Sequence, residues 1–315
     1  MAFERLLGNE RLKQNLSVSI CRGRISHFYL ISGPVGSGKH LLAELLAQAL
    51  LCTGEEKPCG VCAGCRKVLA GSHPDYISVT DPEHKDVAVK LIREAREDMF
   101  VRPNEGAHKV YLFPQSMRIE GQNALLKILE EPPSYGVFIL LSENPEQLLP
   151  TVRSRCTELK LLPVAPSVLK PYLAEAFPDA APEDLDGAVR RSGGYVGQAM
   201  ELLRSGLQQE PEVEAFVKSF AAKNTMGLLQ VLVPMEKKSR DQALPIFHAW
   251  KQALQEGLSC RSGMPAVSPS ARLLSAERSG KDLLHAIQAM EKAIEYAQGN
   301  VSIAAICSWL THTLR

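Results

Sequence analysis

Short apolar runs alternate with amphipathic segments through the first half of the chain. The runs are rich in Val, Ile, Leu, Phe and Tyr, which favours buried strands at 27–31, 75–80, 109–113, 137–141 and 157–161. The segments between them repeat apolar residues at three- or four-residue intervals, which predicts helices at 41–50, 87–100 and 123–133. Strands that alternate with helices in this order predict a parallel sheet flanked by helices.

The pattern is helical at both ends of the chain. Residues 2–24 predict an amphipathic helix that leads into the first strand. After residue 165, Pro166 and Pro182 open two short helices, and a third begins within 192–199. Apolar residues recur at helical intervals through 208–315, which predicts further helices. The exception is 259–276, where Ser, Gly, Pro and Arg predict a flexible loop.

These changes of pattern predict a division into three domains. An α/β domain occupies 1–165, a small helical domain 166–207 and an all-α domain 208–315. The length of 315 residues suits two or three domains of ordinary size.

The first strand runs into a glycine-rich segment, Gly33-Pro34-Val35-Gly36-Ser37-Gly38-Lys39. Its spacing is that of a P-loop, and the strand before it and the helix after it supply the context that this motif requires. Backbone N–H groups of such a loop and the positive end of the following helix bind phosphate. We therefore expect nucleotide contacts at Gly33, Gly36, Ser37, Gly38, Lys39 and His40.

Two positions that would hold magnesium depart from the P-loop pattern. His40 stands where the motif has Ser or Thr. The strand at 109–113 ends in Pro114 and Gln115, whereas a P-loop ATPase has carboxylates at this strand end. The sequence therefore predicts a loop that can hold ATP or ADP without a competent Mg²⁺ site, in a chain that does not hydrolyse ATP on its own.

Four cysteines lie within fourteen residues after the P-loop helix: Cys52, Cys59, Cys62 and Cys65. Four thiolates at this spacing, with glycines and a proline between them for tight turns, suit a closed, structural zinc knuckle. An iron–sulfur cluster is the alternative, although Arg66 follows the last cysteine where the ferredoxin pattern has proline.

Composition and charge exclude several classes of protein. The chain is 45% hydrophobic and 23% charged with a net charge of +1, which is ordinary for a globular protein and gives no general basic excess for nucleic acid. No apolar run reaches the roughly 18 residues of a membrane span, and the N-terminus lacks the apolar core of a signal peptide. We expect a cytoplasmic protein with reduced cysteines and no membrane contact.

Together, these motifs resemble a known family. The P-loop with the run 27–30 before it, the cysteine knuckle after its helix, the segment 123–133 and Ser154-Arg155-Cys156, in this order, are similar to the bacterial DNA polymerase III clamp loader, a set of AAA+ proteins. The resemblance is strong over residues 1–165 and general over the remainder. It implies an AAA+ P-loop domain with a zinc module at 52–65, then a helical lid, then a helical collar that joins subunits.

The family contains motor subunits that hydrolyse ATP and a delta prime subunit that does not. Motor subunits have Thr at the place of His40 and an acidic pair at the place of Pro114 and Gln115, so the departures favour the delta prime class. AAA+ ATPases also carry a nucleotide-sensing arginine at the start of the third lid helix, where this chain has Gly197 and Gln198.

The resemblance implies that Arg155 acts in trans, as an arginine finger in the nucleotide site of an adjacent subunit. A guanidinium is permanently charged and matches a phosphoryl group in geometry. The alternative is an ordinary surface ion pair at the end of a strand. The implied partners are gamma/tau-like motor subunits and a delta-like subunit in a hetero-oligomeric ring, with the sliding clamp and primed DNA reached through the complex. Polymerase activity would belong to that assembly.

Two other functions remain open at this point. An ATP-hydrolysing motor or another AAA+ DNA remodelling ATPase is opposed by His40 and Gln115. A DNA-binding zinc protein is opposed by the near-zero net charge and by the lack of a basic, aromatic-studded stretch around 52–65.

Overall fold

The computed structural model describes residues 3–204, 211–264, 266, 268–299 and 301–314. The chain divides into two compact units, Met1–Arg204 and Ser205–Arg315. The predicted boundary at residue 207 lies outside the described residues. Each unit is therefore described by itself.

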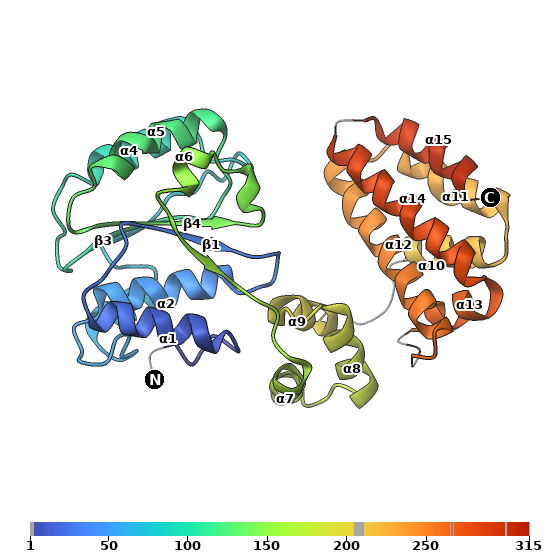
Figure 1. Ribbon diagram of the computed structural model, residues 1–315, viewed down its shortest axis with the longest axis horizontal. Helices are drawn as coiled ribbons and strands as arrows, with labels where there is room; N and C mark the ends of the chain where they lie inside the picture. The colour runs from blue at the N-terminus through green and yellow to red at the C-terminus, as the bar shows by residue number, and fades with distance from the viewer. Residues whose placement is uncertain (1–2, 205–210, 265, 267, 300, 315) are drawn as a thin grey trace. The chain divides into compact units, whose positions relative to one another are not determined.

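A five-stranded sheet forms the centre of the first unit. Its strands are β1 (Phe28–Ser32), β2 (Tyr76–Ser78), β3 (Lys109–Phe113), β4 (Gly136–Ser142) and β5 (Thr157–Lys160). Their order across the sheet is β2-β3-β4-β1-β5, and every neighbouring pair is parallel. Because β1 lies between β4 and β5, the loop that follows it emerges in the middle of the carboxyl edge, where α/β sheets bind their ligands (Figure 1).

Helices cover both faces of this sheet, as Figure 1 shows. The covering helices are α1 (Glu10–Cys21) and α2 (Lys39–Leu51) on one face, and α4 (Val89–Asp98) and α5 (Ile119–Glu130) on the other. Alternate strand residues point to opposite faces, so Ile31 joins the core under α2 while Leu30 joins the core under α4 and α5. Burial on both faces explains why the central strands β1, β3 and β4 are mostly apolar, whereas the edge strand β5 is largely exposed. The predicted parallel α/β architecture is confirmed.

Shorter helical segments connect these elements. They are α3 (Ala63–Leu69), the 3₁₀ turn η1 (Pro145–Gln147) and α6 (Pro150–Arg153). α3 follows the cysteine cluster, and α6 leads directly into Ser154-Arg155-Cys156.

The helix predicted at 2–24 begins later than expected. α1 spans Glu10–Cys21, so the prediction is wrong for residues 3–9 and 22–24. Gly8 and Asn9 have φ angles of 67° and 56°, in the left-handed region that a right-handed helix cannot include.

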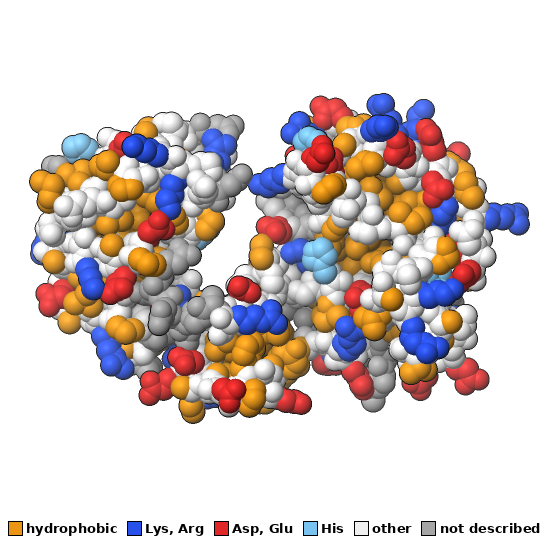
Figure 2. Space-filling view, turned by 180° about the vertical axis from the view of Figure 1, so that it is seen from behind, with side chains coloured by type: hydrophobic (Ala, Val, Ile, Leu, Met, Phe, Trp, Pro, Cys, Tyr) orange, Lys and Arg blue, Asp and Glu red, His pale blue; other side chains and the backbone are white. Residues whose placement is uncertain are grey.

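Three helices follow the sheet within the first unit: α7 (Pro166–Ala176), α8 (Pro182–Arg191) and α9 (Val196–Arg204). Proline occupies the first position of α7 and of α8, where its missing N–H costs no helical hydrogen bond. Leu169, Leu173 and Ala199 form part of their small buried core. Val168 and Tyr172 stay exposed, and Figure 2 shows hydrophobic side chains gathered on the surface of this helical group.

The second unit is helical throughout its described residues. Its helices are α10 (Pro211–Ala221), α11 (Thr225–Met235), α12 (Arg240–Arg261), α13 (Pro269–Glu277), α14 (Gly280–Gln298) and α15 (Ile303–Thr313). Their apolar faces close on one core, in which the rings of Phe216 and Trp250 stack with centroids 4.5 Å apart. The predicted all-helical C-terminal part is confirmed.

The flexible loop predicted at 259–276 is wrong over most of its length. α12 continues to Arg261, and α13 begins at Pro269. The hydroxyl of Ser268 accepts the backbone N–H of Ala271, and proline at the first helical position favours the turn. The same Ser and Pro that indicated a loop therefore start a helix; residues 265 and 267 lie outside the described part of the chain.

No helix among the described residues is long and apolar enough to cross a bilayer. On the face drawn in Figure 2, basic and acidic side chains are interspersed over both units. This mixture agrees with the net charge of +1.

Candidate functional site

The P-loop residues come together between β1 and α2. Gly36 and Gly38 have φ angles of 74° and 95°, a conformation that side chains rarely adopt, so the loop requires glycine at both places. The side chain of Ser37 is buried, and its Oγ has no hydrogen-bond partner among the described residues. An unpaired buried hydroxyl in a loop of this shape fits an anionic ligand such as a phosphate group.

The lysine of the motif and the histidine that replaces its Ser or Thr lie at the start of α2. Lys39 Nζ donates to the carbonyl oxygens of Gly33 at 2.7 Å and Pro34 at 2.9 Å, so the ammonium bends back onto its own loop. Burial lowers the pKa of Lys39, and the nearby carboxylate of Glu143 opposes this shift. Partial burial and the charge of Lys39 lower the pKa of His40, so at pH 7 its imidazole is neutral and lacks the oxygen ligand that Mg²⁺ prefers.

The start of α9 packs directly on the P-loop. The Gly197 N–H donates to the Gly36 carbonyl at 2.8 Å, and Gln198 Nε2 donates to the Val35 carbonyl at 2.7 Å. A Cβ added at Gly197 would lie 2.8 Å from the Gly36 Cα, so this contact excludes any side chain at position 197. An arginine cannot occupy that position unless the helix moves away from the loop.

Gln115 fills the strand end where a P-loop ATPase would have a carboxylate. Its Oε1 accepts the Asp81 N–H at 2.7 Å, and its Nε2 donates to the carbonyls of Asp81 at 2.9 Å and His84 at 2.8 Å. The amide is thereby committed to holding the loop that follows β2. It supplies no negative charge for a metal ion.

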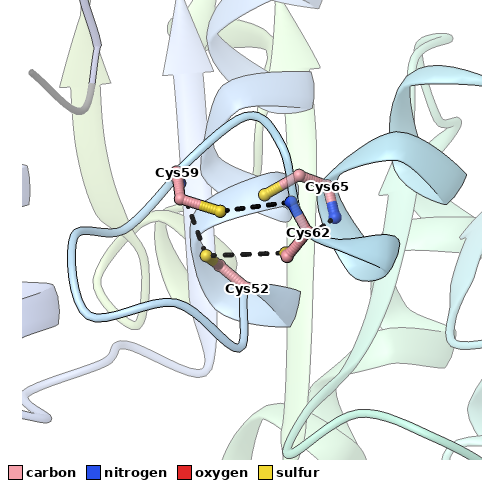
Figure 3. A group of neighbouring side chains, drawn as sticks. All are labelled: Cys52, Cys59, Cys62 and Cys65. Atoms are coloured by element: carbon pink, nitrogen blue, oxygen red, sulfur yellow. Dashed lines mark hydrogen bonds between the residues drawn. The ribbon is translucent and has the colours of Figure 1, made fainter.

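The four cysteine sulfur atoms form a cluster (Figure 3) in which all lie within 4.8 Å of one another. Cys52 Sγ and Cys62 Sγ are 3.8 Å apart. Tetrahedral zinc with Zn–S bonds of about 2.3 Å places its sulfur atoms about 3.8 Å apart, so the donor set fits a Cys₄ zinc site. The cluster confirms that Cys52, Cys59, Cys62 and Cys65 converge, as the spacing predicts.

Backbone groups support this cluster. The N–H groups of Gly54 and Cys59 lie 3.3 and 3.4 Å from Cys52 Sγ, and the Cys65 N–H lies 3.4 Å from Cys62 Sγ. Burial acts to raise the pKa of Cys62, but hydrogen bonds from Cys65 and Thr53 outweigh it and lower the pKa to about 5. Such donors stabilise the thiolate form at Cys62, whereas burial raises the pKa of Cys65 to about 12.

The Ser-Arg-Cys segment is a hydrogen-bonded turn at the end of α6. Ser154 Oγ donates to the Thr151 carbonyl at 3.2 Å, and Cys156 Sγ donates to the Val152 carbonyl at 3.0 Å. Burial raises the pKa of Cys156 to about 12, so this thiol stays protonated and keeps its hydrogen bond. Serine and cysteine thus fold back onto α6, and Arg155 between them keeps 39% of its side chain exposed.

Arg155 lies at the opposite edge of the sheet from its own P-loop. β5 begins at Thr157, which pairs with Tyr29 near the start of β1, so the preceding turn is at the amino edge. The P-loop follows Ser32 at the carboxyl edge. A strand of five residues spans about 16 Å, which exceeds the length of an arginine side chain. The predicted nucleotide residues therefore come together, whereas Arg155 and the cysteine cluster lie apart from them.

The sequence did not predict two acidic side chains that lie beside the candidate residues Arg155 and Lys39. Glu130 accepts a hydrogen bond from Arg155, and Glu143 lies near Lys39. Glu130 belongs to the segment 123–133 that carries the family resemblance, but nothing in the linear pattern pairs it with an arginine 25 positions later.

A parallel sheet with a P-loop at its carboxyl edge, followed by helical parts, defines a P-loop protein of the α/β class. The sequence model of the family described as "DNA polymerase III, delta subunit" matches residues 8–165. The delta prime subunit of DNA polymerase III from Pseudomonas aeruginosa is 35% identical over 240 residues, which are 73% of this chain and 70% of that relative. The chain therefore belongs to the delta-subunit family of DNA polymerase III, within the clamp-loader proteins, and the predicted family is confirmed.

Other relatives carry a different subunit name. The gamma/tau subunit of DNA polymerase III from Mycobacterium tuberculosis is 36% identical over 178 residues, which are 55% of this chain and 31% of that relative. A solved structure of a gamma-subunit-related protein from Thermotoga maritima is 16% identical, covers 96% of this chain and 99% of its own, and has a TM-score of 0.48. Similarity of sequence alone thus does not separate a delta prime role from a gamma/tau role.

Proposed function

We propose that this chain is a delta prime-type subunit of the DNA polymerase III clamp loader that does not hydrolyse ATP itself. In a hetero-oligomeric ring with gamma/tau-like motors and a delta-like subunit, it supports ATP-driven loading of the sliding clamp onto primed DNA. Its place of action is the cytoplasm, and it contacts clamp and DNA through the complex. Within the ring, Arg155 completes the nucleotide site of the adjacent subunit.

One observation carries this proposal: Lys39, Gln115 and Gly197, three positions where an ATPase has catalytic or sensing groups, are engaged in contacts within the chain. Lys39 donates to its own loop, and Gln115 is committed to the loop after β2. Gly197 contacts Gly36 so closely that a sensing arginine has no space there. The absence of magnesium ligands and of a sensing arginine at one site supports a subunit without ATPase activity of its own.

The position of Arg155 supports a role in trans. A residue at the amino edge of its own sheet serves only a phosphate group that another molecule brings to it. Its pairing with Glu130 is also what the surface ion-pair alternative expects, and such pairs contribute under about 1 kcal/mol. The two interpretations therefore differ in the effect on catalysis, not on stability.

The P-loop fits a bound nucleotide whose phosphates are held without turnover. The phosphates would be held by the backbone N–H groups of Gly36 and Gly38, the hydroxyl of Ser37 and the ammonium of Lys39. The bound nucleotide would supply only negative charge and volume that fills the site. Lys39 would have to leave the Gly33 and Pro34 carbonyls, so binding of ATP or ADP competes with contacts within the loop.

The relatives named gamma/tau favour a second candidate function, an ATP-hydrolysing motor. DNA-stimulated ATP turnover by the isolated chain would support that function. We expect turnover at background level, because neither His40 nor Gln115 provides an oxygen anion for magnesium.

The test of the proposal is ATP turnover by the reconstituted loader with the Arg155→Ala variant. We expect a large loss of DNA-stimulated turnover, approaching the roughly 10³-fold that an arginine finger supplies at a single site. Arg153→Ala is the matched control, because Arg153 is two residues away and pairs with Glu146 at 2.6 Å. Size-exclusion chromatography checks that each variant complex assembles.

Turnover equal to wild type in an assembled Arg155→Ala complex would overturn the trans role. The chain would then be a scaffold of the ring. An equal loss in the Arg153→Ala complex would attribute the effect to general damage at α6.

A further inference from the structure

The guanidinium of Arg155 is held from two sides. One terminal nitrogen, NH1, donates to the Thr151 carbonyl at 2.9 Å, and the other, NH2, donates to Glu130 Oε1 at 3.1 Å. A guanidinium has five N–H donors, so three remain for a phosphoryl group. Both contacts together fix the plane of the group while leaving part of its hydrogen-bonding edge free.

The two acceptors come from different elements. The Thr151 carbonyl belongs to α6 and also accepts from Ser154 Oγ, so it is part of the hydrogen-bonded turn that carries Arg155 itself. Glu130 comes from a different element, because it is the last residue of α5. A single contact leaves the side chain free to rotate about it, and the second contact removes that rotation.

Helix stability does not explain an acidic residue at this place. The C-terminus of a helix carries partial negative charge, which disfavours a carboxylate in its last turn. Glu130 is at the end of α5, next to Glu131, and both precede the proline pair that ends the helix. The contact that the structure provides for this carboxylate is Arg155.

We infer that Glu130 is a positioning residue that aims the Arg155 guanidinium for the neighbouring nucleotide site; this inference rests on the proposed trans role of Arg155. Glu130 itself touches no nucleotide. Its carboxylate orients the arginine before the subunits meet, so the group needs no reorganisation when the neighbouring phosphate arrives.

The chain offers a matched control pair. Arg153 pairs with Glu146 through the same kind of contact, and both acidic side chains are more than half exposed. Removing either carboxylate deletes one surface ion pair and changes the net charge by the same amount. Only the removal of Glu130 frees Arg155.

The experiment measures kcat and KM for ATP in the reconstituted loader with primed DNA and sliding clamp. We expect Glu130→Ala to lower kcat roughly twofold to fivefold, the size of an exposed ion pair, with KM unchanged. Glu130→Gln keeps an acceptor oxygen and should recover most of the loss, whereas Glu146→Ala should equal wild type. The melting temperature of the free variants should be unchanged. A merely structural role would instead lower the melting temperature together with kcat.

A double-mutant cycle assigns the effect to the arginine. In the Arg155→Ala background, the further change Glu130→Ala should have no effect. A loss in Arg155→Ala with wild-type kcat in Glu130→Ala would overturn the positioning role alone. A further loss from Glu130→Ala in the Arg155→Ala background would also overturn it, and wild-type turnover in Arg155→Ala would overturn the trans role and this inference together.

Discussion

The carboxylate of Asp75, just before β2, is fully buried, and backbone N–H groups stabilise its negative charge by hydrogen bonds. It accepts N–H groups of Asn104, Glu105 and Gly106 at 2.6, 2.8 and 2.7 Å. Burial acts to raise the pKa of Asp75, but these donors outweigh it and lower the pKa below its ordinary value of 3.8. A carboxyl group whose pKa is lowered by folding stabilises the fold above its unfolded pKa.

At the residue scale we expect Asp75→Asn to lower the free energy of unfolding by about 1–3 kcal/mol at pH 7, because N–H donors around position 75 lose an acceptor. The wild-type advantage is present above pH 3.8 and disappears as the pH falls through the lower pKa of the folded state. Urea unfolding at several pH values checks this, with the exposed Asp179→Asn as control. A difference that persists unchanged in strong acid would contradict the charge-based explanation.

Residues whose function depends on local spacing were predictable, and residues whose function depends on distant partners were not. The P-loop and the four cysteines act within segments of seven and fourteen residues, so their spacing alone indicated their chemistry. Gln115 was recognised as a missing carboxylate, but its contacts with Asp81 span 34 positions. The contact between Gly36 and Gly197 likewise depends on the packing of α9, which no linear pattern contains.

At the scale of elements, α2 joins the P-loop to the cysteine cluster. It begins at Lys39 and ends at Leu51, one residue before the first cysteine. Near its end, Gln48 Nε2 donates to the Cys65 carbonyl at 3.3 Å, and Gly64 is so close to the Leu51 carbonyl that an added Cβ would lie 2.3 Å from it. The cysteine cluster therefore packs on the last turn of the P-loop helix.

We expect one zinc per chain, and we expect its removal to loosen the last turn of α2. Four thiolates released from a metal repel one another beside the negative end of that helix. Metal analysis should find about one zinc in wild type and less than about 0.1 in Cys59→Ser, with a lower melting temperature and faster amide exchange at 48–69. Exposed Cys21→Ser is the control that keeps zinc, and iron in the purified chain would favour the cluster alternative.

The order of elements was predictable because β1, β3 and β4 are nearly continuous apolar runs, but the order of strands across the sheet was not. β1 pairs with β4 and β5, which are more than 100 residues away in sequence. The predicted helix boundaries were wrong where a single residue sets the backbone conformation. Asn9 with its positive φ precedes α1, and Ser268 caps the start of α13 with its hydroxyl.

At the scale of the whole molecule, the second unit contains its own core. The buried residues of that core all lie between Val213 and Leu314, and they come from helices α10 to α15 and from Leu314, which directly follows α15. About 110 residues with one closed core are an ordinary domain size. Such a segment does not need the sheet of the first unit to bury its apolar surface.

We therefore expect the fragment 205–315 to fold alone, which also tests the predicted collar domain. Circular dichroism should show a helical spectrum and one cooperative urea transition, with a free energy of unfolding on the order of 5 kcal/mol or more. A fragment 225–315 is the matched control: it lacks α10 and loses Phe216, which stacks on the buried Trp250, so it should lose the cooperative transition. A fragment 205–315 without cooperative unfolding would mean that its helices depend on the first unit. The boundary between lid and collar would then lie inside one folding unit instead of between two.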